Sequence, residues 1–278
     1  MMNTLNVAAI QLTSTKNWQE NVREVTRLVE LAVQDNARLV VLPENVFLFA
    51  GREMRDLAES DDQAELLKCV TELAKKHNIY LVIGSHPSLL RPDGVEVPDG
   101  KVRQTCWVVD PQGEFVGRYD KIHLFDVTVD DKAASYKESD AIEKGDLLPQ
   151  VVDIDGFKIG LSICYDVRFP ELYRALTDQG ADVFLVPAAF TYVTGKAHWD
   201  ILLAARSIEN QCFVLGVGQC GWHSKTRQTF GHSSLYSPFG RKLAGLEESP
   251  GYFVYRIERE DLEHCRTKMP CLSHRRLK

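Results

Sequence analysis

The chain has 278 residues, of which 44% are hydrophobic and 26% charged, a balance typical of a globular protein rather than a disordered or fibrous one. The net charge of −6 and the lack of a basic stripe argue against a nucleic-acid-binding surface. No apolar run is long enough to cross a membrane, and the first residues lack the features of a secretory signal. We therefore expect a cytoplasmic protein with neither nucleic acid nor membrane as a partner.

The spacing of the cysteines and histidines indicates whether disulfides or metal sites are to be expected. The seven cysteines are odd in number and irregularly spaced, which favours reduced thiols. No cysteine pair has Cys-x-x-Cys spacing, and the eight histidines form no His-x-x-x-His pattern. The sequence thus predicts no metal ion and no cofactor.

The first half of the chain alternates between predicted strands and helices. Hydrophobic periodicity indicates strands over 6–12, 38–42 and 79–84, and helices over 17–35 and 61–77. The second strand should stop at Pro43, which lacks the N–H that a ladder needs. A hairpin over 103–109 and 114–119 follows. The stretch 124–148 has little periodicity, so we expect a long surface loop, and such loops are usually functional.

The second half continues the alternation. A hairpin over 151–153 and 157–163 leads into Cys164, and a helix over 169–179 should end at Gly180. The remaining elements are a strand over 182–186 that stops at Pro187, a helix over 198–210, and strands over 212–218, 232–236 and 252–257. No linker interrupts this order. We therefore expect one domain over 1–278, of the α/β class, with a mixed sheet system covered by helices.

Three predicted strands run into a residue that could do chemistry: Glu44, Lys121 and Cys164. Ligands of α/β sheets gather at strand ends. Cys164 also precedes a helix start, where backbone N–H groups favour the reactive thiolate. Taken singly, each residue has a simpler explanation. Glu44 could merely end a strand, Lys121 could be a solvated surface lysine, and Cys164 could be a buried core cysteine.

Taken together, the three could form a hydrolytic site. A thiol nucleophile needs a base, and a tetrahedral intermediate needs an oxyanion stabiliser. Glu44 could be the base, while Lys121 and the Tyr165 backbone N–H could stabilise the oxyanion. A histidine base, as in papain-like enzymes, would be the alternative; the candidates are His123, His198 and His232.

Three blocks of the chain resemble the nitrilase superfamily of carbon–nitrogen hydrolases. They are Leu42–Asn45, Arg118–Asp126 and Ile163–Glu171, in this order. The resemblance spans nearly the whole chain and implies a four-layer αββα sandwich that forms a homodimer. It also implies roles for site residues, with Glu44 as general base, Lys121 as oxyanion stabiliser and Cys164 as nucleophile. A further glutamate of the family is best matched by Glu138.

Three more segments, 187–191, 194–199 and 206–211, are similar to the superfamily branch of deaminated glutathione amidases and omega-amidases. Within that branch, the segment 219–223, followed by Arg227 and 231–233, is more similar to the deaminated glutathione amidases. The resemblance implies a small anionic amide substrate, first of all deaminated glutathione, which is split into 2-oxoglutarate and cysteinylglycine. An omega-amidase acting on 2-oxoglutaramate, an N-carbamoyl amidase and a non-catalytic binding protein remain alternatives.

The candidate substrate-binding residues lie in these segments and in the block Ile163–Glu171. They are Tyr165, Arg168, Thr191, His198, His223 and Arg227. Arginine can bind a carboxylate through two parallel hydrogen bonds. Four of them also have a structural alternative: Arg168 could pair with Asp166 or Glu171, His198 could pack at a helix start, and His223 and Arg227 could simply be solvated.

Overall fold

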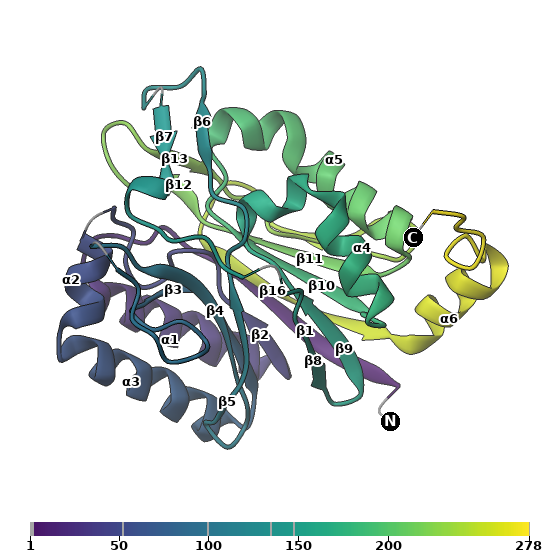
Figure 1. Ribbon diagram of the computed structural model, residues 1–278. Coiled ribbons are helices and arrows are strands. Elements are labelled where there is room, and N and C mark those ends of the chain that lie inside the picture. The colour runs from purple at the N-terminus through teal and green to yellow at the C-terminus, as the bar shows by residue number, and fades with distance from the viewer. Residues whose placement is uncertain (1–2, 52, 99, 134, 147, 278) are drawn as a thin grey trace.

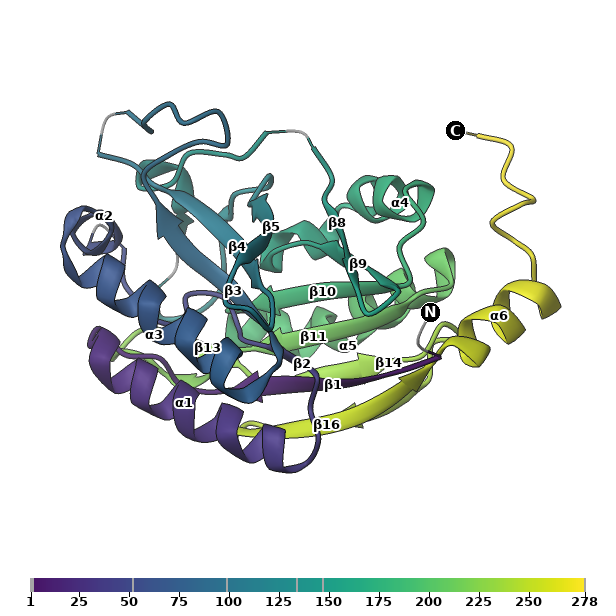
Figure 2. The same cartoon turned by 90° about the horizontal axis from the view of Figure 1, so that it is seen from below.

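Two six-stranded sheets form the centre of the protein, and helices cover the outer face of each (Figures 1 and 2). The computed structural model describes residues 3–51, 53–98, 100–133, 135–146 and 148–277. The layers follow one another as helices, sheet, sheet, helices. The expected αββα sandwich is therefore confirmed.

The first sheet has the order β16-β1-β2-β3-β4-β5. Its strands are β1 (Thr4–Gln11), β2 (Leu39–Val41), β3 (Tyr80–Ser88), β4 (Arg103–Val109), β5 (Phe115–Asp120) and β16 (Gly251–Glu258). The neighbours among β1, β2 and β3 are parallel, and the other pairs are antiparallel. Helices α1 (Trp18–Gln34) and α3 (Asp62–His77) lie on its outer face.

The second sheet has the order β15-β14-β11-β10-β9-β8. Its strands are β8 (Val151–Ile154), β9 (Phe157–Leu161), β10 (Val183–Ala188), β11 (Phe213–Gly218), β14 (Ser234–Tyr236) and β15 (Lys242–Gly245). Read from β8, the pairings are antiparallel, parallel, parallel, antiparallel and antiparallel, the same series as in the first sheet read from β16. Helices α4 (Pro170–Asp178) and α5 (Tyr192–Asn210) cover this sheet.

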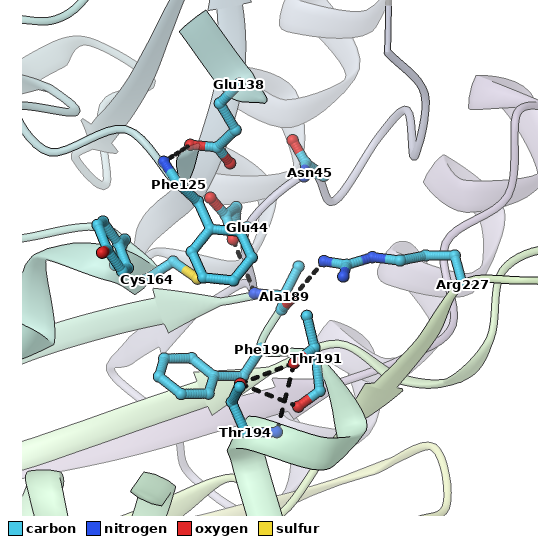
Figure 3. A pocket seen from close by; sticks show the side chains of 11 residues that line it. Glu44, Asn45, Phe125, Glu138, Cys164, Ala189, Phe190, Thr191, Thr194 and Arg227 are labelled. Atoms are coloured by element: carbon cyan, nitrogen blue, oxygen red, sulfur yellow. Dashed lines mark hydrogen bonds between the residues drawn. The ribbon is translucent and has the colours of Figure 1, made fainter. Parts of the chain in front are cut away.

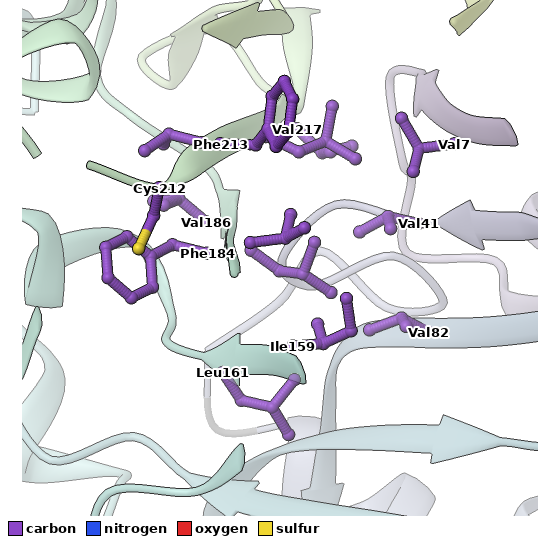
Figure 4. Packing of buried hydrophobic residues seen from close by; sticks show 14 of the residues in the cluster. Val7, Val41, Val82, Ile159, Leu161, Phe184, Val186, Cys212, Phe213 and Val217 are labelled. Atoms are coloured by element: carbon purple, nitrogen blue, oxygen red, sulfur yellow. The ribbon is translucent and has the colours of Figure 1, made fainter. Parts of the chain in front are cut away.

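The main core lies between the two sheets. Figure 4 shows Val7, Val41 and Val82 of the first sheet facing side chains of the second, among them Ile159 and Val217. All of these side chains are fully buried. Because side chains alternate along a strand, the intervening residues of each sheet face its helices.

Close helix packing on the second sheet depends on Gly216. A Cβ atom at this position would lie 2.5 Å from Cδ1 of Leu203 and 2.7 Å from Cζ2 of Trp199. Both side chains belong to α5. The helix can therefore approach the sheet only over a residue without a side chain.

Shorter elements complete the fold. They are α2 (Glu53–Glu59), β6 (Asp126–Thr128), β7 (Ser135–Lys137), β12 (Cys220–Trp222), β13 (Gln228–Phe230), α6 (Arg259–Lys268) and the 3₁₀ turns Glu138–Asp140 and Cys164–Arg168. The β6–β7 and β12–β13 hairpins extend from one end of the sandwich (Figure 1). No helix of the described residues is long and apolar enough to span a membrane.

Several expected boundaries were wrong. Helix α5 begins at Tyr192 rather than at residue 198, because the Thr191 side chain accepts a hydrogen bond from the Thr194 N–H and starts the helix earlier. Strand β10 continues through Pro187 to Ala188. The stretch 124–148, expected as an irregular loop, contains the β6–β7 hairpin and a 3₁₀ turn.

Candidate active site

The three strand ends meet at one end of the gap between the sheets. Glu44 follows β2 and Lys121 follows β5, so both come from the first sheet. Cys164 follows β9 of the second sheet. The site therefore lies between the layers, and each sheet contributes to it.

Lys121 is the centre of a buried ionic cluster. Its Nζ lies 2.7 Å from Oε1 of Glu44, and 2.9 and 2.8 Å from Oε1 and Oε2 of Glu138. The side chains of Lys121 and Glu44 are 0% and 2% exposed, and that of Glu138 is 24% exposed. Burial lowers the pKa of Lys121, but the charges of Glu138 and then Glu44 outweigh it and raise that pKa well above its usual value. The ammonium is thus permanently charged.

Glu44 is held through both carboxylate oxygens. Oε1 accepts from Lys121, and Oε2 accepts from the Ala189 N–H at 2.8 Å (Figure 3). The chain before Glu44 passes tightly over Gly84, where a Cβ atom would lie 2.2 Å from the carbonyl oxygen of Leu42. Only glycine fits there, so Gly84 helps to set the position of the carboxylate.

A second ionic cluster fixes the segment around Lys121. Arg103 bonds to Asp120 at 3.1 Å and to Glu143 at 2.8 Å, and the Gly145 N–H donates to the Lys121 carbonyl at 2.7 Å. Hydrogen bonds from Arg91, and then from Arg103, lower the pKa of Glu143 to about 2 against the opposing effect of burial. The segment 143–145 is therefore tied to the chain that carries the lysine.

Cys164 lies in a strained backbone conformation. Its φ is +48°, a left-handed value that L-residues with a side chain rarely adopt, and it opens the 3₁₀ turn after β9. Asp166, fully buried, holds this turn by accepting from the Ile163 N–H at 2.9 Å. The same carboxylate accepts from the Tyr119 hydroxyl at 2.8 Å and from the His123 N–H at 3.1 Å. Asp166 thus links the turn that contains Cys164 to the segment that carries Lys121.

The surroundings of Cys164 favour the thiol over the thiolate. Burial, followed by the negative charge of Glu44, raises the pKa of the thiol well above its usual value, although Lys121 acts in the opposite direction. The resting group is therefore a neutral thiol. A neutral thiol is a weak nucleophile, so a reaction at Cys164 would need a proton acceptor, and Glu44 lines the same pocket.

A small pocket opens beside these groups. Its cavity volume is about 30 Å³, room for one or two water molecules. Cys164, Glu44 and Glu138 line it, together with Tyr165, Thr191 and Arg227 of the candidate binding residues. In the view of Figure 3, Cys164 and Arg227 lie on opposite sides of Glu44 and Ala189.

The other three candidate binding residues do not line this pocket. Nη1 of Arg168 donates to Nδ1 of His198 at 3.1 Å, and the guanidinium lies 5.1 Å from the ring centre of Phe190. Arg168 therefore pairs with His198 rather than with the neighbours Asp166 or Glu171.

His223 is engaged elsewhere. Nδ1 donates to the Ser14 carbonyl at 2.8 Å, and Nε2 is 2.7 Å from Oγ1 of Thr229. Burial lowers the pKa of His223 to about 4. The ring is therefore neutral at physiological pH and does not offer a positive charge to an anion.

None of the three histidines considered as a base lines the pocket. Nδ1 of His123 is bonded to Asp166 at 2.7 Å, and its ring stacks on Phe169. His198 is bonded to Arg168, and the His232 ring stacks on Phe230. Within the described ranges, no group of three or more His, Cys, Asp or Glu side chains is arranged to hold a metal ion.

Two backbone N–H groups escaped the sequence analysis. The Ala189 N–H holds Glu44, and the Phe125 N–H holds Oε2 of Glu138 at 2.8 Å. Ala189 follows β10 and so obeys the same strand-end rule that singled out the other residues. Phe125 had no such signal, because a backbone donor is independent of the side chain.

Comparison with known proteins identifies the family. The family model of carbon–nitrogen hydrolases matches residues 6–267. The deaminated glutathione amidase of Synechocystis sp. is 43% identical over 96% of this chain and 97% of its own, and that of Yersinia enterocolitica is 39% identical over 99% and 94%. The crystal structure of Saccharomyces cerevisiae Nit3, a member of the nitrilase superfamily, superimposes with a TM-score of 0.86 at 26% identity, covering 100% of this chain and 98% of that one. The chain therefore belongs to the carbon–nitrogen hydrolase family of the nitrilase superfamily.

Proposed function

We propose that this protein is a thiol amidase that hydrolyses deaminated glutathione to 2-oxoglutarate and cysteinylglycine. The observation that carries the proposal is the buried cluster in which a neutral thiol, a fixed carboxylate and a permanent ammonium line or adjoin one pocket. Relatives named deaminated glutathione amidase match nearly the whole chain and support the choice of substrate.

The first half of the reaction forms an acyl-enzyme. Glu44 accepts the thiol proton while the sulfur of Cys164 bonds to the amide carbon, and the carbonyl electron pair moves to oxygen. Lys121 has three N–H donors; one is directed to Glu44, and the two oxygens of Glu138 can share a second. The third N–H, with the Tyr165 backbone N–H, stabilises the oxyanion. The C–N bond then breaks, the nitrogen takes the proton from Glu44, and cysteinylglycine leaves.

The second half hydrolyses the thioester. Glu44 takes a proton from water, and the hydroxide oxygen bonds to the acyl carbon. The C–S bond breaks, the sulfur regains the proton held by Glu44, and 2-oxoglutarate leaves. Glu138 does not exchange protons in this scheme; it orients Lys121 through its two contacts.

A substrate comparison tests the proposal. We expect a higher kcat/KM for deaminated glutathione than for 2-oxoglutaramate, and mass spectrometry should detect a 2-oxoglutaryl group on Cys164 after rapid quenching. Cys164→Ala should abolish turnover, whereas Cys69→Ser, at a half-buried thiol on α3, should not change it. A preference for 2-oxoglutaramate would overturn the substrate, and turnover by Cys164→Ala would overturn the mechanism.

We also propose that two copies associate. Helix α5 exposes Ile201 (70% accessible) and Ile208 (53% accessible) on its outer face. Phe239, which follows β14, is 67% accessible. Large exposed apolar side chains are typical of association surfaces. Light scattering should give the mass of a dimer, and Ile201→Glu should shift it toward monomer. The control is Leu90→Glu. Leu90 is also exposed (52%), but it follows β3 of the other sheet, so this change should leave the mass unchanged.

We further propose that residues 1–278 function as one domain in the cytoplasm. The largest hydrophobic cluster includes buried side chains from both sheets, which supports cooperative unfolding. All seven cysteines are free thiols, which supports a reducing compartment. A single thermal transition, with the same midpoint by fluorescence and circular dichroism, would agree with one domain, and two midpoints would not.

A further inference from the structure

A second cavity adjoins the catalytic pocket. Its volume is about 220 Å³, compared with about 30 Å³ for the pocket beside Cys164. Arg227 and Glu138 line both, so the two spaces share a wall. The rest of the second cavity is largely apolar, with Phe49, Met54 and Ile142 among its lining residues.

Arg227 presents an unused hydrogen-bond donor at this shared wall. Its guanidinium lies 4.6 Å from the ring centre of Tyr136 and 5.7 Å from that of Phe49. Nη2 donates to the Ala189 carbonyl at 2.8 Å, whereas Nη1 is buried and has no partner among the described residues. A guanidinium placed in this way is complementary to an anion, because a buried donor without an acceptor is unfavourable.

Gln104, which lines the same cavity, has an acceptor to which no described residue donates. The residue is 1% exposed, and its Nε2 donates to Oδ1 of Asn45 at 2.7 Å. Its Oε1 is buried and lacks a partner in the described parts of the chain. Two residues of the cavity wall thus each have one buried polar atom without a partner among the described residues, a donor suited to an anion and an acceptor suited to an N–H group.

We infer that this second cavity binds the leaving half of the substrate, a short peptide whose free terminal carboxylate is held by Nη1 of Arg227. The inference rests on the proposed amidase function and adds where the leaving group binds. The peptide N–H of the same dipeptide donates to Oε1 of Gln104. The apolar wall accommodates the cysteine side chain.

The size of the dipeptide agrees with this placement. From the scissile nitrogen, two extended residues reach at most about 7 Å, so their carboxylate must be bound close to the catalytic pocket. That pocket holds only one or two water molecules, so a dipeptide leaving group needs the space of the second cavity. Arg227 therefore selects for amides whose leaving group is a peptide acid.

A double-mutant cycle, in which one change is made in the protein and the other in the substrate, tests the contact between Arg227 and the terminal carboxylate. Deaminated glutathione and its C-terminal amide are compared on the wild type, Arg227→Met and Arg227→Lys. A charge-assisted hydrogen bond corresponds to about 10- to 100-fold, so the wild type should favour the acid by this ratio in kcat/KM. Arg227→Met should turn over acid and amide about equally, and Arg227→Lys should retain part of the preference.

The control is Lys137→Met, which removes the other cation of the cavity wall. Lys137 is 66% exposed and pairs with Asp140, so its loss should leave the ratio of acid to amide nearly unchanged. An equal ratio in the wild type, or an unchanged ratio in Arg227→Met, would overturn the inference. An equal loss of preference in Lys137→Met would also overturn it, because it would indicate a general charge effect.

A binding measurement separates this inference from the proposed function. Cysteinylglycine and its C-terminal amide are titrated into Cys164→Ala, with and without Arg227→Met. If the wild type does not hydrolyse deaminated glutathione, but the acid still binds more tightly in an Arg227-dependent manner, the proposed function fails and the cavity assignment stands. If hydrolysis occurs and the two dipeptides bind alike, the cavity assignment fails alone.

Discussion

Replacing Lys121 by methionine would remove the only cation that contacts both site glutamates among the described residues. Glu44 and Glu138 lie within 2.9 Å of Nζ, and Glu44 is 2% exposed. Breaking a buried ion pair from one side costs about 3–5 kcal/mol, because a charge is left without compensation. For a chain of this size, about 2 °C of melting temperature corresponds to 1 kcal/mol, so Lys121→Met should melt about 6–10 °C lower.

The double variant Lys121→Met/Glu138→Gln separates stability from catalysis. Removing one of the two stranded charges should recover part of the lost melting temperature, measured by circular dichroism at pH 7. Activity should not recover, because loss of an oxyanion stabiliser costs about 10²- to 10³-fold in kcat. A melting temperature of Lys121→Met within 1 °C of the wild type, or a double variant with restored turnover, would refute this reasoning.

Three further outcomes are expected. Glu44→Gln should abolish amide hydrolysis yet shift the alkylation of Cys164 by iodoacetamide to lower pH, because the negative charge that raises the thiol pKa is gone; a parallel loss of both reactions would contradict this. The pKa of Glu143 is lowered to about 2 from 4.5, so its contribution to stability is present above about pH 4.5 and lost as the pH falls toward 2. The melting temperature of Glu143→Gln should therefore fall less steeply over that range than that of the wild type, and equal slopes would argue against the assignment. Gly84→Ala places a Cβ 2.2 Å from a carbonyl oxygen just before Glu44 and should reduce kcat, whereas Gly251→Ala, with its nearest atom at 3.8 Å, should not.

The fold was predictable wherever one face of an element is buried. The helices expected over 17–35 and 61–77 correspond to α1 (Trp18–Gln34) and α3 (Asp62–His77), each with a regular set of buried residues. Helix α6 (Arg259–Lys268) was not expected, because Leu262 and Cys265 are its only buried residues in the described structure. Two buried positions are too few to define a period.

The residues of the candidate site could be predicted from the sequence, but their pKa shifts could not. The strand-end rule selected Glu44, Lys121 and Cys164, and the structure brings all three together with Glu138. The raised pKa of Cys164 could not be predicted from the sequence, because it results from burial and from a carboxylate far away in the sequence. Local sequence around a cysteine contains the helix start that favours a thiolate, but not the distant charge that opposes it.

Ala189 has no functional group of its own, yet its peptide units connect two tasks. Its N–H fixes the carboxylate of Glu44, and its carbonyl fixes the guanidinium of Arg227. A change that moves the guanidinium of Arg227 should therefore also disturb the carboxylate of Glu44 through a single residue. Under the roles proposed for Glu44 and Arg227, substrate range and turnover should therefore change together when the end of β10 at Ala188 is altered.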